Sequence, residues 1–467
     1  MNNATGLAND RRGRLRAPWT AFQLLLLLSS WILCSWMGQK THPAAIRRTQ
    51  YLFAFAVILS YTTAWMLYVT WTRARLRLAV FRAITATTML GVVLACLELP
   101  AYLGFIHYRR FWDAVTGNWR GPANEFEVDL ELAWRRVPNL RMSGRPQGDI
   151  AQAWNMPLRT ERKLEFTFNS RGFRTRETSR SDIILLGDSY IEGHLVSDDE
   201  TCSSQLARLT GLTVGNFGQS GYGTAQELRV LELYGMEQKP HLVVWFFYEG
   251  NDLYDDQEFE NNLVYFEQVG RDPSKVRNLL GSKRSSFRAA SFAANAFAAL
   301  RRACDALVPN QMPYFGWFGK SQGRPLRLFF HDDCAYPLGE YELERFEKTK
   351  AALRKGKALC EKDEAKLWLC FIPTKFRVYG DLCDLPESSP CRKWKPWNLA
   401  SLVATFCETE GIPFFDLTGP LREAAQAGSV LYYPADTHWN QAGHSFVARF
   451  LAEKLREPGG SLGSPVK

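Results

Sequence analysis

Several signatures of common protein classes are missing from this 467-residue chain. No Gly-rich stretch carries the lysine of a phosphate-binding loop or the spacing of a dinucleotide site, and no Cys/His spacing resembles a zinc site. The G-x-S-x-G turn of α/β-hydrolases is missed by one position at residues 218–221. Gly and Pro counts are ordinary, at 34 and 22, and the chain is 46% hydrophobic, which excludes collagen-like and disordered chains. We therefore expect a globular chain with no cofactor and no metal.

Acidic residues are scarce in the first 110 residues. Asp10 and Glu98 stand against 13 Lys and Arg, so this part carries a charge of +11, while the remainder carries −2 of the total of +9. A basic excess confined to the most apolar part of a chain is typical of a membrane anchor, and it does not indicate a nucleic-acid-binding surface. We expect a lipid bilayer and no nucleic acid among the partners.

Three apolar runs lie in this part, at about residues 18–38, 51–71 and 83–106. Each is close to the ~20 residues that a helix needs to cross a ~30 Å hydrocarbon core. Glu98 interrupts the third run and is expected near the interface, where a carboxylate costs less free energy than at the centre. A cleaved signal peptide is the alternative for the first run, but no A-x-A site follows it. We predict three transmembrane helices within a membrane anchor at residues 1–110.

The positive residues predict the orientation of this anchor. Arginines at positions 11, 12, 14 and 16 and at 73, 75, 77 and 82 outnumber the three basic residues of the first connection. This bias favours a cytoplasmic N-terminus, and three spans then place the rest of the chain in the periplasm or outside the cell. An oxidising compartment could close a disulfide between Cys383 and Cys391, and two unpaired thiols are the equal alternative.

Beyond the anchor, the pattern predicts a linker at 111–163 and an α/β domain at 164–457. Near-continuous apolar runs predict parallel strands, and helical stretches separate them, so we expect a doubly wound, mainly parallel five-stranded sheet. We interpret residues 254–338 as an insertion, either a lid or polymer-binding wall or a structural element against the membrane, and residues 458–467 as a flexible tail. The expected strands are 183–186, 213–217, 242–247, 366–372 and 412–415, and the expected helices are 224–237, 340–361, 397–410 and 441–455.

Polar clusters follow the first three strands, and another precedes the last helix. In doubly wound sheets such clusters meet beyond the carboxyl ends of the strands. They supply the parts of an acyl-transfer site: Ser189 as nucleophile, His438 as base and Asp436 to orient the imidazole. The backbone N–H groups of Ser189 and Gly221 and the side-chain amide of Asn251 are the expected oxyanion donors.

Each assignment has an alternative. Ser189 could simply cap the next helix, and Asn251 with Asp252 could form an ordinary turn. We interpret His194 and His444 as surface residues, although either could be the base instead of His438. The remaining residues are interpreted as supports: Asp188 and Asp252 position loops, Gly250 belongs to the Asn251 turn, and Trp439 packs.

The blocks GDS at 187–189, NxGxxGxG at 216–223, GND at 250–252 and DTHWN at 436–440 together resemble the SGNH, or GDSL-like, hydrolase superfamily. The one-residue gap between Asp436 and His438 departs from the commonest pattern of that superfamily. It resembles the branch of alginate-type polysaccharide O-acetylation proteins, as do residues 372–375 and 169–174. The resemblance implies a flavodoxin-like topology and an acylated glycan or other acyl ester as substrate.

These observations lead to three hypotheses. The first is a membrane-anchored serine esterase or O-acetyltransferase that forms an acyl-enzyme on Ser189. As a transferase, it would need a multi-spanning membrane protein as acyl donor. The second is a non-catalytic glycan-binding or scaffold subunit of a polysaccharide modification complex. The third is a lipase-like esterase. The sequence leaves open the choice between hydrolysis and transfer.

Overall fold

The computed structural model describes residues 59–65, 68, 76–103, 105–106, 108, 125–154, 156, 158, 160–272, 291–296, 299, 313–319, 324–333 and 335–457. The chain forms two compact units. The N-terminal unit comprises Met1–Arg109, Ala153–Pro157 and Phe287–Gln311. The sheet unit comprises Arg110–Gln152, Leu158–Ser286 and Met312–Lys467.

The N-terminal unit contains one long apolar helix among the described residues. This helix, α3 (Leu76–Tyr102), includes a stretch, Val80–Tyr102, that is long and apolar enough to cross a membrane. Apolar side chains such as Phe81 and Ile84 are exposed on it. It matches the third predicted span. The first predicted span lies outside the described residues, and of the second only 59–65 and 68 are described, as helix. The described residues therefore support one span, and a three-span anchor stays a prediction.

Glu98 of α3 binds a second segment of the same unit. Its carboxylate accepts hydrogen bonds from the Ser291 hydroxyl at 2.7 Å and from the backbone N–H groups of Ala293 at 2.7 Å and Phe292 at 3.1 Å. Residues 292–296 are helical, so Glu98 satisfies the free N–H groups at the start of this turn. This part of the predicted insertion thus belongs to the same unit as α3.

The sheet unit is built on five parallel strands in the order β11-β10-β7-β5-β6. Their order in the chain makes this the flavodoxin-like arrangement, and the predicted five-stranded α/β sheet is confirmed. β7 lies at the centre, where Trp245 pairs with Leu186 of β5 on one side and Leu369 of β10 on the other. The strands are β5 (Ile183–Leu186), β6 (Val214–Asn216), β7 (Leu242–Tyr248), β10 (Lys366–Ile372) and β11 (Phe414–Asp416).

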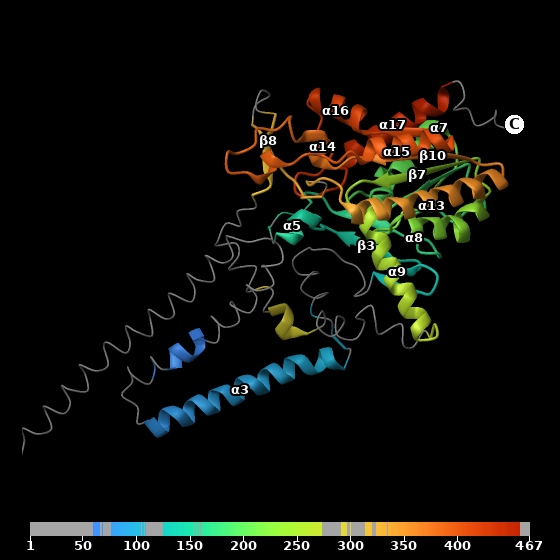
Figure 1. The fold of residues 1–467 in the computed structure, drawn as a ribbon. Coiled ribbons are helices and arrows are strands. Elements are labelled where there is room, and N and C mark those ends of the chain that lie inside the picture. The colour runs from blue at the N-terminus through green and yellow to red at the C-terminus, as the bar shows by residue number, and fades with distance from the viewer. Residues whose placement is uncertain are drawn as a thin grey trace, which may run out of the picture. The chain divides into compact units, whose positions relative to one another are not determined.

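Helices cover both faces of this sheet (Figure 1). Side chains of β7 alternate between two hydrophobic cores: Val243, Trp245 and Phe247 belong to one, and Val244 and Phe246 to the other. The first core is closed by α8 (Thr224–Val230), α9 (Asp252–Gln268), α13 (Glu340–Lys362) and α15 (Leu399–Glu410). The second is closed by α7 (Cys202–Thr210), α14 (Lys375–Tyr379), α16 (Thr418–Gln426) and α17 (Gln441–Arg456). Burial on both faces explains why the strands are continuously apolar.

The structure differs from the linker expected at 111–163. From residue 125 onward this segment forms regular elements, because its apolar side chains are buried: Leu132 and Trp134 pack into the first core, whereas Leu140 and Met142 belong to a separate, smaller hydrophobic cluster. These elements are β1 (Phe126–Asp129) paired with β2 (Ala133–Arg136), β3 (Arg141–Gly144) paired with β4 (Leu164–Thr167), and α5 (Asp149–Ala153). Within the predicted insertion, α9 is followed by the strand pair β8 (Phe315–Phe318) and β9 (Leu326–Phe329).

The predicted helix at 224–237 is interrupted. After α8 the chain continues as a π-helical turn at Leu231–Gly235 and a 3₁₀ turn at Met236–Gln238. Two further 3₁₀ turns, Asp198–Glu200 and Pro390–Lys393, lie in loops. The four-residue helix α6 (Ser189–Glu192) follows β5 directly and begins the candidate site.

Candidate active site

Ser189 is the first residue of α6, on the turn that leaves β5. Asp188 is the N-cap of this helix, and its Oδ1 accepts a hydrogen bond from the Tyr190 N–H at 2.9 Å. A Cβ at Gly187 would lie 2.8 Å from Ile191, so only glycine allows this tight turn. The local sequence thus directs Ser189 toward the carboxyl edge of the sheet.

Ser189, His438 and Asp436 form one continuous hydrogen-bonded chain. The Ser189 hydroxyl lies 2.7 Å from His438 Nε2, and His438 Nδ1 lies 2.7 Å from Asp436 Oδ1. The same Oδ1 accepts the backbone N–H of His438 at 2.8 Å. All three side chains are buried. Because Asp436 turns back onto its own loop, a gap of one residue between Asp and His is sufficient.

The charges in this chain favour an ionised pair of Asp436 and His438. Burial opposes the charged form of His438, but the Asp436 carboxylate and its hydrogen bond outweigh burial and raise the pKa of His438 to about 9. Burial likewise opposes ionisation of Asp436, yet the charge and hydrogen bond of His438 hold the pKa of Asp436 well below its ordinary value. An imidazolium that forms when Ser189 loses its proton is therefore stabilised.

The three expected oxyanion donors come from different elements: Ser189 begins α6, Gly221 follows Ser220, which is hydrogen-bonded to Glu192 of α6, and Asn251 precedes α9. Gly221 has φ +77°, which favours glycine. The backbone N–H groups of Ser189 and Gly221 donate no hydrogen bond to any residue that the structure describes. Asn251 is the N-cap of α9, and its Nδ2 donates to Asp255 at 2.7 Å, which uses one of two hydrogens. Three N–H groups thus stay available for a ligand.

The predicted supporting residues have distinct roles. Asp188 Oδ2 accepts a hydrogen bond from the Ser189 hydroxyl at 3.3 Å, so Asp188 both caps the helix and contacts the proposed nucleophile. Asp252 accepts the Tyr248 N–H at 2.8 Å, and a Cβ at Gly250 would lie 2.4 Å from the Tyr248 ring. Trp439 is fully buried, with its ring 4.9 Å from that of Tyr190, and acts as packing.

Neither alternative base is the surface residue we expected. The His194 ring centroid lies 5.0 Å from that of His438, and burial together with the His438 charge lowers the pKa of His194 to about 4. His444 is fully buried because it lies on the inner face of α17, and burial lowers its pKa to about 3. Neither of its ring nitrogens bonds to a described residue. Ser189 contacts His438 instead.

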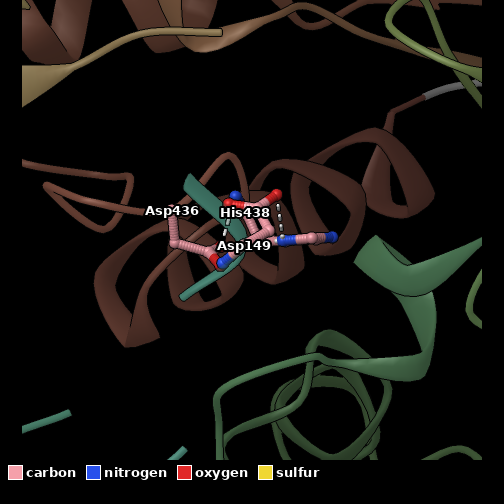
Figure 2. Close-up of side chains that lie close together, drawn as sticks. All are labelled: Asp149, Asp436 and His438. Carbon is pink, nitrogen blue, oxygen red and sulfur yellow. Dashed lines mark hydrogen bonds and ion pairs between the residues drawn. The ribbon is translucent and has the colours of Figure 1, made fainter. Parts of the chain in front are cut away.

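Sequence reasoning missed two residues of this site. Lys375, at the start of α14, is buried, and its ammonium donates to the carbonyls of Asp436 at 2.6 Å, Tyr433 at 2.9 Å and Pro434 at 3.2 Å. Burial lowers its pKa to about 8. Asp149, from the expected linker, lies beside Asp436 and His438 (Figure 2). Lys375 ends the 372–375 block noted in the sequence, where no role was assigned to it, whereas nothing in the sequence marks Asp149.

Asp149, Asp436 and His438 also form the one group of potential metal ligands within the described part of the chain, with ligand atoms within 4.8 Å of one another. Their oxygens are already used, however. Asp436 binds N–H groups of His438 and Asp149, and Asp149 binds Thr437 and Ile150. This set fits a hydrogen-bonded loop better than a cation site.

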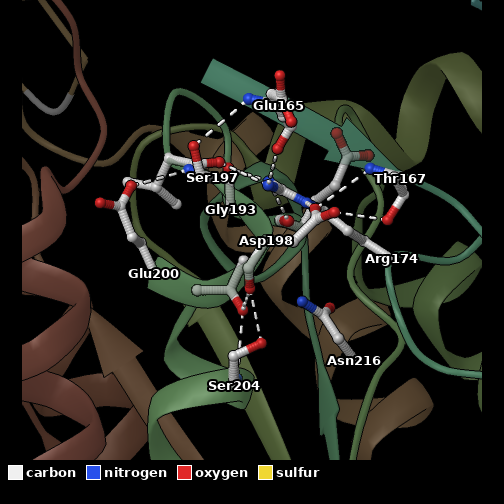
Figure 3. A network of polar contacts seen from close by, with 12 residues as sticks. Glu165, Thr167, Arg174, Gly193, Ser197, Asp198, Glu200, Ser204 and Asn216 are labelled. Carbon is white, nitrogen blue, oxygen red and sulfur yellow. Dashed lines mark hydrogen bonds and ion pairs between the residues drawn. The ribbon is translucent and has the colours of Figure 1, made fainter. Parts of the chain in front are cut away.

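A second polar network holds the loop that follows α6 (Figure 3). Buried Arg174 donates to the carbonyls of Gly193 and Val196, both at 2.6 Å, and to Asp198 at 2.7 Å. Arg174 is the last residue of the 169–174 block noted in the sequence. The network fixes the loop at the end of α6, the helix that begins with Ser189. The thiols of Cys383 and Cys391 are both free, which agrees with the unpaired alternative.

Part of the chain matches the model of a known family. Residues 321–465 match the model of the "SGNH hydrolase-like domain, acetyltransferase AlgX". The match includes Asp436 and His438 but begins after Ser189, Gly221 and Asn251, and it confirms the resemblance predicted from the sequence. No curated protein matches the chain.

Solved structures with similarity to this chain include a G-D-S-L family protein and an acetylxylan esterase. A G-D-S-L family protein from Desulfitobacterium hafniense has a TM-score of 0.30 and 10% identity, over 59% of this chain and 99% of that one. An acetylxylan esterase from Geobacillus stearothermophilus, in a catalytic-mutant form, has a TM-score of 0.31 and 15% identity, over 60% of this chain and 97% of that one.

Proposed function

We propose that this chain, whose residues 321–465 match the SGNH hydrolase-like domain of the acetyltransferase AlgX, forms an acyl-enzyme on Ser189 and passes the acyl group to a glycan hydroxyl or to water. The observation that carries this proposal is the continuous chain from Ser189 through His438 to Asp436, with 2.7 Å at both steps. A fold with a lost activity has no need to keep a nucleophile, base and carboxylate in this contact.

In the first half-reaction, Ser189 Oγ attacks the acyl carbonyl carbon while its proton moves to His438 Nε2. The negative oxygen that develops accepts hydrogen bonds from the N–H groups of Ser189 and Gly221 and from Asn251 Nδ2. The carbon–oxygen bond to the leaving alcohol then breaks, and His438 gives its proton to that alcohol. Asp436 stays ionised and stabilises the imidazolium throughout.

In the second half-reaction, the attacking hydroxyl gives its proton to His438 and adds to the acyl carbon. When the intermediate collapses, Ser189 Oγ leaves and recovers a proton from His438. Water as attacking group yields a free acid, and a sugar hydroxyl yields a new ester. The acetyltransferase description of the matching family supports the sugar hydroxyl.

The N-terminal unit supplies the proposed membrane attachment. Val80–Tyr102 is apolar and long enough to span a bilayer, and the excess arginines around it favour a catalytic unit outside the cytoplasm. An acetyl donor that acts there must itself cross the membrane, so the proposed partner for transfer is a multi-spanning acyl-donor protein. With hydrolysis no such partner is needed.

The test uses the full-length chain in detergent with 4-nitrophenyl acetate, with and without a soluble glycan acceptor. Parent protein should release 4-nitrophenolate and show one acetyl group on Ser189 by mass spectrometry after rapid quench. Ser189→Ala should lose both signals, whereas Ser401→Ala, a change at an exposed serine of α15, should keep them.

Four outcomes separate the hypotheses, with octanoyl esters assayed beside acetyl esters. Acetylated glycan identifies a transferase, and acetate alone identifies an esterase. Turnover that favours octanoyl over acetyl esters identifies the lipase-like alternative. A parent protein with no acetyl on Ser189 and no turnover would reject the catalytic proposal in favour of a glycan-binding or scaffold subunit.

A further inference from the structure

The Asp436–His438 loop is contacted by a segment almost three hundred residues earlier in the chain. This segment is Gly148 and Asp149, at the start of α5. Neither Gly148 nor Asp149 belongs to the four sequence blocks that resemble the superfamily, although Asp436 and Thr437, which they contact, belong to the last of them. The two residues therefore add contacts to the Asp436–His438 loop that those four blocks do not provide among themselves.

Asp149 binds both residues on the N-terminal side of His438. Its backbone N–H donates to Asp436 Oδ2 at 2.6 Å. Its Oδ1 accepts the backbone N–H of Thr437 at 2.8 Å, and its Oδ2 accepts the Thr437 hydroxyl. The same Oδ2 lies 3.8 Å from His438 Nδ1.

These contacts complete the hydrogen bonding of the short loop. Asp436 uses Oδ1 for both N–H groups of His438, so its Oδ2 needs a donor from elsewhere. Asp149 N–H is that donor, and it prevents the carboxylate from rotating away from the imidazole. Thr437, the one residue between Asp436 and His438, is held on the other side by the Asp149 carboxylate.

Close packing shows that this contact is built into the fold. A Cβ at Gly148 would lie 2.6 Å from the Ala435 carbonyl oxygen and 2.7 Å from Asp436 Cβ, so only glycine allows the approach. The Ala151 N–H donates to the same carbonyl at 3.0 Å. Four consecutive residues, 435–438, are thus in contact with α5 or the residue before it.

We propose that Asp149 is a positioning residue for the reaction, a second carboxylate that fixes the orientation of Asp436 and His438 and shares in stabilising the imidazolium. This inference rests on the proposed function of Ser189. The charged and titratable groups near His438 are Asp436, Asp149, Asp188, His194, Tyr190 and His444, and those near Asp149 also include His331 and Lys375.

The electrostatic part of the role of Asp149 predicts the direction in which the pKa of His438 should shift when the Asp149 charge is removed. Asp149 is among the charges that favour protonated His438. Burial and the Asp436 charge raise the pKa of Asp149 to about 6, so Asp149 is ionised over the range where His438 titrates near pH 9. Removal of the Asp149 charge should therefore make His438 easier to deprotonate.

The test measures how fast a fluorophosphonate probe modifies Ser189 of the full-length chain in detergent, from pH 6 to 10. In this reaction Ser189 Oγ bonds to phosphorus, fluoride leaves and His438 takes the proton. For Asp149→Asn, which keeps the shape and the backbone N–H, the midpoint of the pH profile should move down by about one unit. For Asp149→Ala, which also loses the contacts to Thr437, the plateau rate should fall roughly tenfold or more as well.

Asp381→Asn is the matched control, because Asp381 is an exposed carboxylate paired with Arg422 at the surface. Its profile should equal that of the parent. An unchanged midpoint in folded Asp149→Asn would overturn the inference, since a purely structural role lowers the rate at every pH by the same factor. A parent chain that the probe does not modify at Ser189 would instead reject the proposed function.

Discussion

The Arg136 guanidinium and the Glu192 carboxylate form a buried ion pair with two contacts, 2.6 Å from Nη2 to Oε1 and 3.2 Å from Nε to Oε2. Arg136 ends β2, and Glu192 ends the helix that begins with Ser189. The same carboxylate accepts the N–H and hydroxyl of Ser220, both at 2.9 Å. Because Gly221 follows Ser220, this pair connects the proposed nucleophile to a proposed oxyanion donor.

Arg136→Met should therefore destabilise the fold strongly. The substitution leaves Glu192 buried without its cation, which typically costs about 3–5 kcal/mol. Arg229→Met is the comparison, because Arg229 forms half-exposed ion pairs with Glu131 and Glu232, of the kind usually worth about 0–1 kcal/mol. Urea unfolding followed by tryptophan fluorescence measures both. Equal losses in the two variants would contradict this assignment.

Ester turnover should rise with pH. The base must be neutral to accept the Ser189 proton, and the pKa of His438 is raised to about 9, so kcat/KM should increase up to about pH 9 and level off above it. The profile is measured with an acetyl ester after correction for spontaneous hydrolysis. His241→Gln, at an exposed histidine, is the control with the same midpoint as the parent. A midpoint near 6.5, the ordinary value for histidine, would show that the Asp436 charge does not raise the pKa of His438.

Gly221→Ala should reduce kcat by a larger factor than its loss of folding stability explains. The residue has φ +77°, so alanine costs about 1–2 kcal/mol, although its Cβ would meet no atom closer than 3.9 Å. A displaced N–H removes one oxyanion donor, a loss of about 10²–10³ in kcat. Gly411→Ala has a similar φ, +66°, and no atom within 4 Å. It should lose similar stability at unchanged kcat, and equal kcat in the two variants would argue against a role for the Gly221 N–H.

Lys375→Met should weaken both the fold and the reaction. The ammonium donates to three carbonyls of the loop that carries Asp436. The Pro434 carbonyl also accepts the Phe329 N–H at 2.8 Å, so the substitution leaves the carbonyls of Tyr433 and Asp436 without this donor, and a buried carbonyl without a donor costs about 1–3 kcal/mol. We expect roughly 3 kcal/mol less stability and a lower kcat at nearly constant KM. Lys355→Met, at an exposed position on α13, is the control. A kcat equal to that of the parent in folded Lys375→Met would mean that the loop keeps its conformation without the ammonium.

The parts of the site that could be predicted are those carried by local sequence. Ser189 lies on the turn that leaves a buried strand, and Asp436 is two residues from His438, so local sequence places Ser189 at the edge of the sheet and Asp436 beside the imidazole. The contact between Ser189 and His438 depends on the parallel α/β fold. His194 and His444 were misjudged because their burial depends on distant elements, the loop beside His438 and the inner face of α17. The same limit applied to residues 125–163, whose short strands gain stability from packing on the core.

The sequence by itself determined the five-stranded sheet and the residues at the ends of its strands, because a strand buried on both faces must be apolar throughout and the chain must turn where it ends. The tertiary structure alone decided which distant side chains complete the site. Asp149 and Lys375 reach the Asp436–His438 loop from separate elements, and Arg136 reaches Glu192 from a hairpin outside the sheet. These contacts depend on how folded elements pack, so no local spacing in the chain records them.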